Sequence, residues 1–243
     1  MKTVEEIIAI YTARSQAAGG AKSKMRNLRD YYNGDVIVPL PELDSDEKSA
    51  VANLLAQGLD QTAMRIASTT PDVFCPPADP SKKRSRDNAN IRRKAILGWW
   101  QHSRMDLQLS KRARHLIGYS STVTQLRFNS KTGCPEWHLR DPLTAYPAKM
   151  LGVDDMRPRD VVFAYERSLG WINSMYPDVG RLFRGDSNVS DDQPIEIIEY
   201  VNEEEQVLIA QRGPIQSGLF PSTSDEQSNV IAELERVQNI MGQ

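Results

Sequence analysis

The sequence is poor in the residues from which most catalytic and metal sites are built. Its 243 residues include only two cysteines and three histidines. Cys75 and Cys134 lie far apart and form no C-x-x-C pair, so we expect two buried or idle thiols in a reducing compartment. The three histidines fall in two successive predicted helices and a predicted hairpin, so we expect packing or surface roles for them. We therefore expect no metal and no cofactor.

Long apolar runs and a strong net charge are also missing. No stretch approaches the ~18 consecutive apolar residues of a membrane helix, and the N-terminal segment MKTVEEIIAIYTARSQ contains acidic residues, unlike a signal peptide. The formal net charge of -2 gives no overall bias toward nucleic acid or membranes. A hydrophobic content of 40% with 26% charged residues is typical of a globular protein. We expect a soluble protein made in the cytosol, with no membrane partner.

Motifs that would indicate an enzyme are incomplete. The stretch GYSST at 118–122 lacks the second glycine of a nucleophile elbow. The stretch GGAKS at 19–23 lacks the upstream glycine and the preceding strand of a phosphate-binding loop. The acidic pairs at 154–155 and 191–192 lie in polar sequence and are typical of turns. We expect no enzymatic activity.

The first half of the chain has helical periodicity. Thr3 and Glu6 form a capping box before a helix. Gly19-Gly20 should loosen or break that helix, and a second one from Ala21 should end at Asn33-Gly34, where glycine readily adopts the left-handed conformation. Two prolines make 35–43 an extended strap that lies on a surface made elsewhere.

Three further helices are predicted. One follows an N-cap at 44–46 and carries an amphipathic stripe; the others span about 84–103 and 106–119. The stripe of the first comprises Val51, Leu54, Leu55, Leu59, Thr62 and Ile66.

After residue 119 the period changes to two. A hairpin is predicted at 122–141, a strand at 160–167 and a second hairpin at 194–211, with a short helix near 169–177. The last stretch, 225–241, has apolar residues at helical spacing. The sequence therefore predicts an α+β fold, with a helical N-terminal half followed by antiparallel β-hairpins. The expected division is a helical part at 1–119, a β-rich part at 120–220 and a helix at 221–243.

Two charged segments are candidate contact surfaces. The segment from residue 82 to residue 114 contains eleven basic residues and only two acidic ones. The candidates for electrostatic contact in it are Arg84, Arg86, Arg92 and Arg93. Such helices suit phosphate binding, a solvated surface or docking on an acidic neighbour. Surfaces that stack on bases have aromatic residues between the basic ones, and this segment does not show that pattern. We therefore favour a solvated surface or docking on an acidic neighbour. The opposite block, 191–205, ends in Glu203, Glu204 and Glu205, and the two blocks would neutralise each other within one subunit or head-to-tail between subunits of a ring.

Adjacent tryptophans Trp99 and Trp100 are candidate subunit contacts. Neighbours on a helix point about 100° apart, so one ring can fill the core while the other faces a partner. Both rings can equally lie under one wide buried stripe.

The segments MRNLRDYYNGDVIVPLPEL (25–43) and VANLLAQGLDQTAMRIASTTPDVFCP (51–76) resemble the N-terminal part of portal proteins, the head-to-tail connectors of tailed bacteriophages. These proteins commonly have a helix ending in a basic-x-x-x-Tyr-Tyr-x-Gly stretch, which Arg29 to Gly34 match approximately, with only one residue between the arginine and the tyrosines. An asparagine on the next helix (Asn53) and a Pro-containing segment after it (Thr70-Pro71) also match. RDPLTAYPA at 140–148 is also similar to the family. The resemblance covers roughly residues 1–150.

The resemblance implies a portal wing-like fold and a structural role. Portal subunits form a ring, usually of twelve copies, at one vertex of the virion capsid, through which double-stranded DNA is packaged and ejected. The partners implied are further copies of the chain, the major capsid protein, the terminase and the neck or adaptor proteins, with assembly in the host cytoplasm. Portal chains are normally longer, so the helix at 221–243 is expected to lead into a missing C-terminal region. No DNA-contacting residue is carried over.

Within this resemblance, Tyr31 and Tyr32 are candidate subunit contacts at a helix end, with Gly34 letting the chain reverse. We expect part of the stripe at 44–68 and the segment 27–41 to bury against an adjacent subunit. Two alternatives remain: a nucleic-acid-binding module that uses the basic helices at 82–114, and an enzyme with an unrecognised site.

Overall fold

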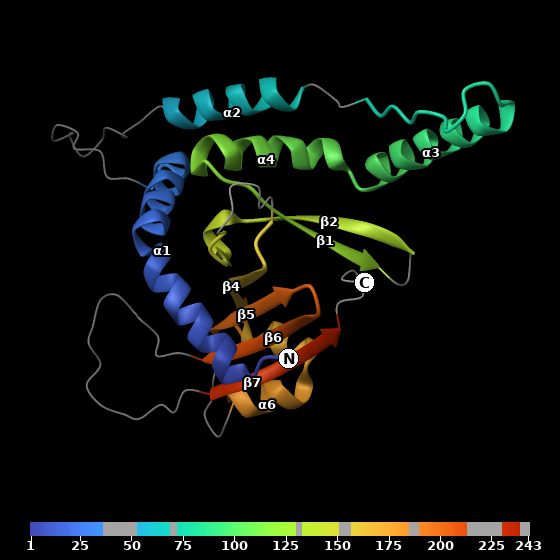
Figure 1. Cartoon of the computed structure of the whole chain (residues 1–243). Helices are drawn as coiled ribbons and strands as arrows, with labels where there is room; N and C mark the ends of the chain where they lie inside the picture. The colour runs from blue at the N-terminus through green and yellow to red at the C-terminus, as the bar shows by residue number, and fades with distance from the viewer. Residues whose placement is uncertain are drawn as a thin grey trace, which may run out of the picture. The chain divides into compact units, whose positions relative to one another are not determined.

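The chain folds as an α+β protein, as the sequence predicts (Figure 1). The computed structural model describes residues 1–35, 53–68, 72–129, 133–150, 157–184, 190–212 and 230–238. The helices are α1 (Val4–Asn33), α2 (Leu54–Ala67), α3 (Lys83–His102), α4 (Met105–Tyr119), α5 (Leu169–Met175) and α6 (Pro177–Arg184), with a 3-10 turn at Pro142–Thr144. The strands are β1 (Val123–Asn129), β2 (Cys134–Arg140), β3 (Ala145–Pro147), β4 (Asp160–Ser168), β5 (Pro194–Asn202), β6 (Glu205–Arg212) and β7 (Val230–Gln238).

The elements form two compact units. Residues 1–20 and 144–243 make one, called here the sheet unit, and residues 21–143 make the other, called the helical unit. The expected division at residues 119 and 220 follows the order of the elements along the chain, whereas this grouping follows their contacts.

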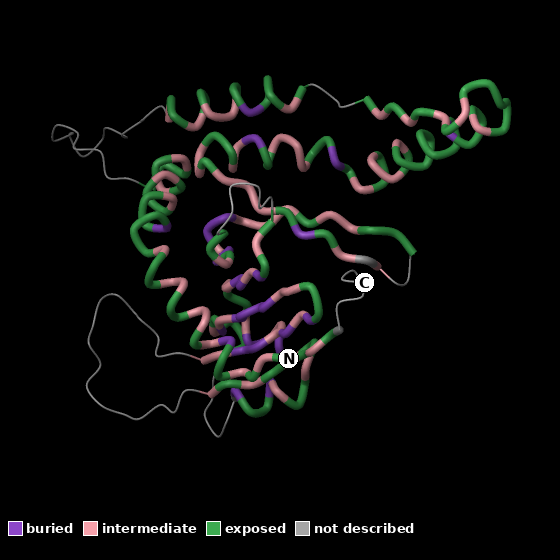
Figure 2. The backbone as a smooth tube through the Cα atoms, in the orientation of Figure 1, coloured by how far each residue is buried: buried purple, intermediate pink, exposed green. Residues whose placement is uncertain are grey.

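The sheet unit is built on an antiparallel sheet with the strand order β3-β4-β5-β6-β7. Ile197 and Ile198 are successive residues of β5, so they point to opposite faces, and both are fully buried. Ile198 packs with Ile7 of α1, whereas Ile197 packs with Ile172 of α5 and Phe183 of α6. The first part of α1 therefore covers one face and α5 and α6 cover the other, which is why buried residues concentrate on the central strands in Figure 2.

Strand β7 corrects one prediction. Helical spacing was expected at 225–241, but Val230–Gln238 is a strand paired antiparallel with β6. Val230, Ala232 and Leu234 pack on the core beside α5 and α6, so the pattern with period two prevails over the helical one. Val230 and Leu234 fit either period, but Ile231 and Val237, which completed the predicted helical pattern, are 40% and 45% exposed. Pairing with the edge of β6 decides for the strand. A bulge opposite Leu208 and Ile209 interrupts the pairing.

Helix α1 corrects a second prediction, because it runs through Gly19 and Gly20 without a break. Two glycines cost about 2 kcal/mol of helix propensity. Packing on both sides of them offsets that cost, through Ile7 in the sheet unit and Leu28 in the helical unit. The predicted capping box is confirmed: the Thr3 amide donates to Glu6 Oε2 at 2.9 Å, and the Glu6 amide donates to Thr3 Oγ1 at 3.3 Å.

The helical unit contains α2 to α4 and the β1–β2 hairpin. Helix α2 lies along α4. The predicted hairpin is confirmed, and its register places Leu126 opposite Trp137 and Thr124 opposite Leu139, so these apolar residues share one face. At the junction of α3 and α4, Arg104 adopts the left-handed conformation, which redirects the chain.

Some sequence predictions lie outside the described residues. These are the strap beyond residue 35, the N-cap at 44–46, Val51 of the stripe, the helix end at Thr70-Pro71 and the acidic pair at 154–155. Within the described ranges, no helix combines the length and apolar character needed to cross a lipid bilayer.

Candidate functional site

The end of α1 is a Schellman motif built from the Tyr-Tyr-Asn-Gly stretch. The Gly34 amide donates to the Tyr31 carbonyl at 3.2 Å, and the Asp35 amide donates to the Asp30 carbonyl at 2.9 Å. Gly34 has φ +82°, a conformation that side chains disfavour. Glycine at this position therefore ends the helix sharply, as the sequence predicts.

Asn53 joins this helix end to the start of α2. Its Nδ2 donates to the carbonyls of Tyr31 at 2.9 Å and Tyr32 at 2.8 Å, while its Oδ1 accepts the Ala56 amide at 2.9 Å. One side chain thus binds two carbonyls of the last turn of α1 and caps the first turn of α2. The amide group suits both tasks, because it carries donors and an acceptor.

Tyr32 links α1 to α2 and α4. Its hydroxyl donates to Asp60 Oδ1 at 3.1 Å, and Arg114 Nε lies 2.7 Å from the same oxygen. Burial, together with the bond to Asp60, raises the pKa of Tyr32. The three side chains form a chain of polar contacts across three helices.

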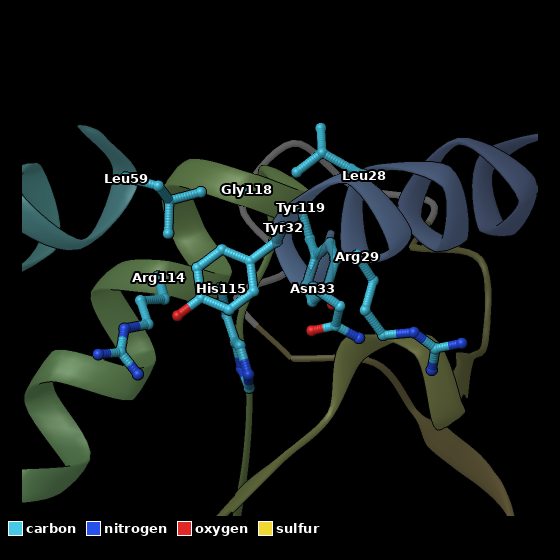
Figure 3. A pocket seen from close by; sticks show the side chains of 9 residues that line it. All are labelled: Leu28, Arg29, Tyr32, Asn33, Leu59, Arg114, His115, Gly118 and Tyr119. Carbon is cyan, nitrogen blue, oxygen red and sulfur yellow. The ribbon is translucent and has the colours of Figure 1, made fainter. Parts of the chain in front are cut away.

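A cavity of about 200 Å³ lies where α1, α2 and α4 meet (Figure 3). Figure 3 shows the Tyr32 ring among the lining residues, with its hydroxyl directed toward Arg114. A Cβ at Gly118 would lie 3.5 Å from both Leu28 and Leu59, which is an ordinary van der Waals distance, so side chains of α1 and α2 both pack near this residue of α4. The lining comprises Leu28, Arg29, Tyr32, Asn33, Leu59, Arg114, His115, Gly118 and Tyr119.

The two tyrosines of the motif differ in environment. Tyr32 is half-buried, whereas the Tyr31 side chain is 53% exposed. Tyr32 therefore serves the interior of the helical unit, and Tyr31 is available to a partner. Both tyrosines were predicted to be subunit contacts, because no pattern in the sequence distinguishes a buried from an exposed ring at these two adjacent positions.

The apolar stripe of α2 is largely uncovered. Leu54, Leu55 and Ile66 are 73%, 47% and 52% exposed, and Leu59 is half-buried. The α2 side chain that is fully buried among the described residues is Ala63, which was not part of the predicted stripe. The helix thus packs through a neighbouring face and leaves larger apolar side chains in solvent.

Trp99 and Trp100 both contact elements of the helical unit. Trp99 Nε1 donates to the Pro135 carbonyl at 2.7 Å, and Trp100 Nε1 donates to Asp106 at 2.9 Å. The Trp100 ring meets Trp137 edge-to-face at 6.4 Å. Both tryptophans are half-buried, so the structure matches neither a fully buried pair nor one core ring beside one free ring.

The basic residues of α3 are displayed to solvent. Arg84, Arg86 and Arg92 are exposed and have no ion pair with any residue that the structure describes. Arg93 is also exposed but forms an ion pair with Asp72, with Nη2 and Oδ1 2.9 Å apart.

The acidic residues at the β5–β6 turn have three different environments. Glu203 pairs with Arg157 at 2.8 Å on the surface, and Glu204 is exposed. Glu205 is only 2% exposed, pairs with Arg236 and accepts the Lys2 amide at 2.9 Å. It therefore stabilises the sheet unit and does not offer its charge to a partner.

Sequence reasoning missed several residues of the helical unit. Asp60 and Arg114 complete the contacts of Tyr32, and Lys22 is 6% exposed with its Nζ donating to the Pro142 carbonyl. Burial lowers the pKa of Lys22 to about 8. An isolated lysine in a helix looks like a surface residue, so the sequence carries no signal for its burial.

The other expected sites have structural explanations. Residues 191–192 form a turn before β5, as predicted, and the Asp191 side chain accepts Asn173 Nδ2 at 3.2 Å. Burial lowers the pKa of His115, which lies beside the Tyr119 ring at 5.7 Å. Among the described residues, no three histidine, cysteine or acidic side chains gather closely enough to hold a metal ion.

Comparison with known proteins adds no assignment. No protein-family model matches the sequence, and no curated protein matches it either.

Proposed function

We propose that this chain is a structural subunit of a ring-shaped portal of a tailed bacteriophage. In this role, copies of the chain surround a channel at one capsid vertex through which double-stranded DNA is packaged and ejected. The partners are other copies of the chain, the major capsid protein, the terminase and the neck or adaptor proteins. The site of action is the virion, after assembly in the host cytoplasm.

The first support is that the segments resembling portal proteins form a single structural feature. Tyr31 and Tyr32 at the end of α1 are 22 and 21 residues from Asn53 before α2, yet Asn53 binds the carbonyls of both. The resemblance therefore concerns a helix junction whose parts depend on one another.

The observation that carries the proposal is the uncovered apolar stripe on α2. Leu54, Leu55 and Ile66 are large apolar side chains, and each is about half exposed or more. Scattered apolar residues are normal on a monomer, but several on one helix beside an exposed tyrosine indicate an interaction surface. A neighbouring subunit would remove this surface from water, at about 25 cal/mol per Å² buried.

Assembly of α2 variants tests the proposal. Leu55→Glu and Ile66→Glu place a charge in the stripe, and Tyr31→Ala removes the exposed ring beside it. Gln57→Glu is the matched control, because it adds the same charge to an exposed position of the same helix away from Leu55 and Ile66. Negative-stain images of the wild type and the control should show rings with a central hole, and the three variants should show fewer rings or none.

The two parts of the proposal can fail separately. Rings that form equally well from all three variants would mean that the stripe is not a subunit contact, although the ring would stand. Wild-type monomers that shift DNA in a gel, with an affinity falling steeply with salt, would instead favour a nucleic-acid-binding module based on α3.

A further inference from the structure

The two compact units carry opposite net charges. Residues 21–143 hold 20 lysines and arginines against 13 aspartates and glutamates, which gives +7 for the helical unit. The rest of the chain holds 10 against 19, which gives -9 for the sheet unit. The net charge of -2 is therefore the small sum of two large and separate charges. Such a distribution bears on association with charged partners rather than on the fold.

Helix α3 presents the positive charge together with apolar surface. Arg84 and Ile91 are seven residues apart and so lie on one helix face, and Ile91 is 63% exposed. Ala95 and Gly98 continue the same face with small residues, and a Cβ at Gly98 would meet nothing within 4 Å. Arginine around an apolar centre is the composition typical of a protein interface. We call this the outer face of α3.

Some acidic side chains of the sheet unit are not paired within the part of the chain that the structure describes. Glu205 forms an ion pair with Arg236, and Glu196 accepts a hydrogen bond from the Tyr11 hydroxyl at 2.6 Å. In contrast, Glu166, Asp192 and Glu204 are exposed, and their side chains form no ion pair or hydrogen bond with any residue that the structure describes. Folding of the sheet unit therefore leaves three negative side chains uncompensated, with Asp192 just before β5 and Glu204 just after it.

We propose that the outer face of α3 in one copy of the chain docks on the acidic sheet unit of a second copy. This inference rests on the proposed ring and specifies how its subunits meet. Because two different surfaces form the contact, it is head-to-tail, and a bound pair of copies keeps one unused surface of each kind. The chain can therefore keep adding copies until the ring closes.

A second copy fits this surface better than nucleic acid does. The sheet unit of a second copy brings a net charge of -9 to the helical unit of the first copy, whose net charge is +7. The contact therefore compensates the charge of both units. Nucleic acid would compensate the helical unit but leave the sheet unit with all its negative charge. Ile91 at the centre of the face also has a use in a protein contact, whereas a phosphate backbone offers it nothing.

Paired charge reversals in the full-length chain test the proposal. Each reversal changes the charge by two, so three of them move the helical unit from +7 to +1 or the sheet unit from -9 to -3. Arg92 and Lys94 flank the outer face of α3, one on each side, and both are exposed. The α3 variant is therefore Arg84→Glu, Arg92→Glu and Lys94→Glu; the sheet variant is Glu166→Lys, Asp192→Lys and Glu204→Lys. The control reverses the exposed cations of the sheet unit, Lys149→Glu, Arg159→Glu and Arg181→Glu, which changes the total charge as much as the α3 variant does.

Native mass spectrometry and light scattering measure the outcome. The wild type and the control should assemble, with an apparent dissociation constant rising at least about tenfold between 0.1 and 1 M NaCl, as the Debye length falls from about 10 to about 3 Å. Each triple variant alone should be folded by circular dichroism and monomeric. Mixing the two variants in equal amounts should restore assembly, because the Lys-bearing sheet unit accepts the Glu-bearing α3 and each unmodified surface still has its partner.

The failures are distinguishable. If the wild type forms rings and both triple variants form them equally well, the α3 docking is wrong while the proposed function stands. The docking is also wrong if mixing restores nothing, since variants that disturb only their own chain cannot rescue each other. If the wild type stays monomeric at every salt concentration, the ring itself is wrong and the docking falls with it.

Discussion

Replacing Asn53 should loosen two helices at once. In Asn53→Ala the Ala56 amide loses its cap, which costs about 1 kcal/mol. The carbonyls of Tyr31 and Tyr32 lose a donor, but both are close enough to solvent to bind water, so each loss costs at most about 0.5 kcal/mol. The expected decrease in the free energy of unfolding is therefore about 2 kcal/mol.

Two further variants separate the parts of this effect. Asn53→Asp keeps the acceptor for Ala56 but removes both donors and places a negative charge at the carboxyl end of α1, so about half the loss should remain. Asn33→Ala is the matched control, because Asn33 is exposed and its side chain has no hydrogen bond to a described residue. It should change stability by less than about 0.5 kcal/mol.

Tryptophan fluorescence during urea unfolding is the assay. Trp99, Trp100 and Trp137 lie in the helical unit and Trp171 in the sheet unit, so the signal reports chiefly on the unit that contains Asn53. All proteins are compared at one protomer concentration, because assembly adds to apparent stability. The expected order of loss is Ala, then Asp, then the control. Equal midpoints for Asn53→Ala and Asn33→Ala would refute the junction as described.

Three other substitutions follow from local geometry. Gly180→Ala should destabilise the sheet unit by about 1–3 kcal/mol in urea unfolding, because its Cβ would lie 2.9 Å from the Asn173 Cα; an unchanged midpoint would show that α5 and α6 are more loosely packed. Ser120→Gly should raise the melting temperature by about 2–4 °C, because Ser120 has φ 54° and glycine relieves about 1 kcal/mol there; a lower melting temperature would argue against this conformation. Burial alone would raise the pKa of Glu205, but hydrogen bonds from the residue 2 amide and Arg236 outweigh it and hold the pKa below its usual value. Its stabilising contribution should be complete above the unfolded-state pKa near 4.5 and lost as pH falls through the lower folded value, so Glu205→Gln should flatten the acid limb of a stability–pH curve.

The sequence predicted elements whose signals are local. The capping box at Thr3, the helix end at Gly34 and the alternation around Leu126 and Trp137 each depend on residues close together in the chain or in one hairpin. The α+β class followed from the change of period near residue 119. Such signals survive because few distant contacts compete with them.

The sequence failed where a distant contact decides the outcome. Val230, Ile231 and Leu234 have helical spacing, but this segment pairs with the edge of β6 as a strand. Gly19 looks like a helix breaker until packing on both sides is known. The same applies to the candidate site, since Tyr32 turns inward because Asp60 lies opposite it.

The central claim is that copies of this chain close into a ring. The most direct test is mass photometry of the 243-residue chain at low salt, combined with negative-stain imaging of the same sample. The account predicts particles at one discrete multiple of the 27.4 kDa protomer mass, each with a central hole. A single species of 27.4 kDa at every protein concentration would contradict it.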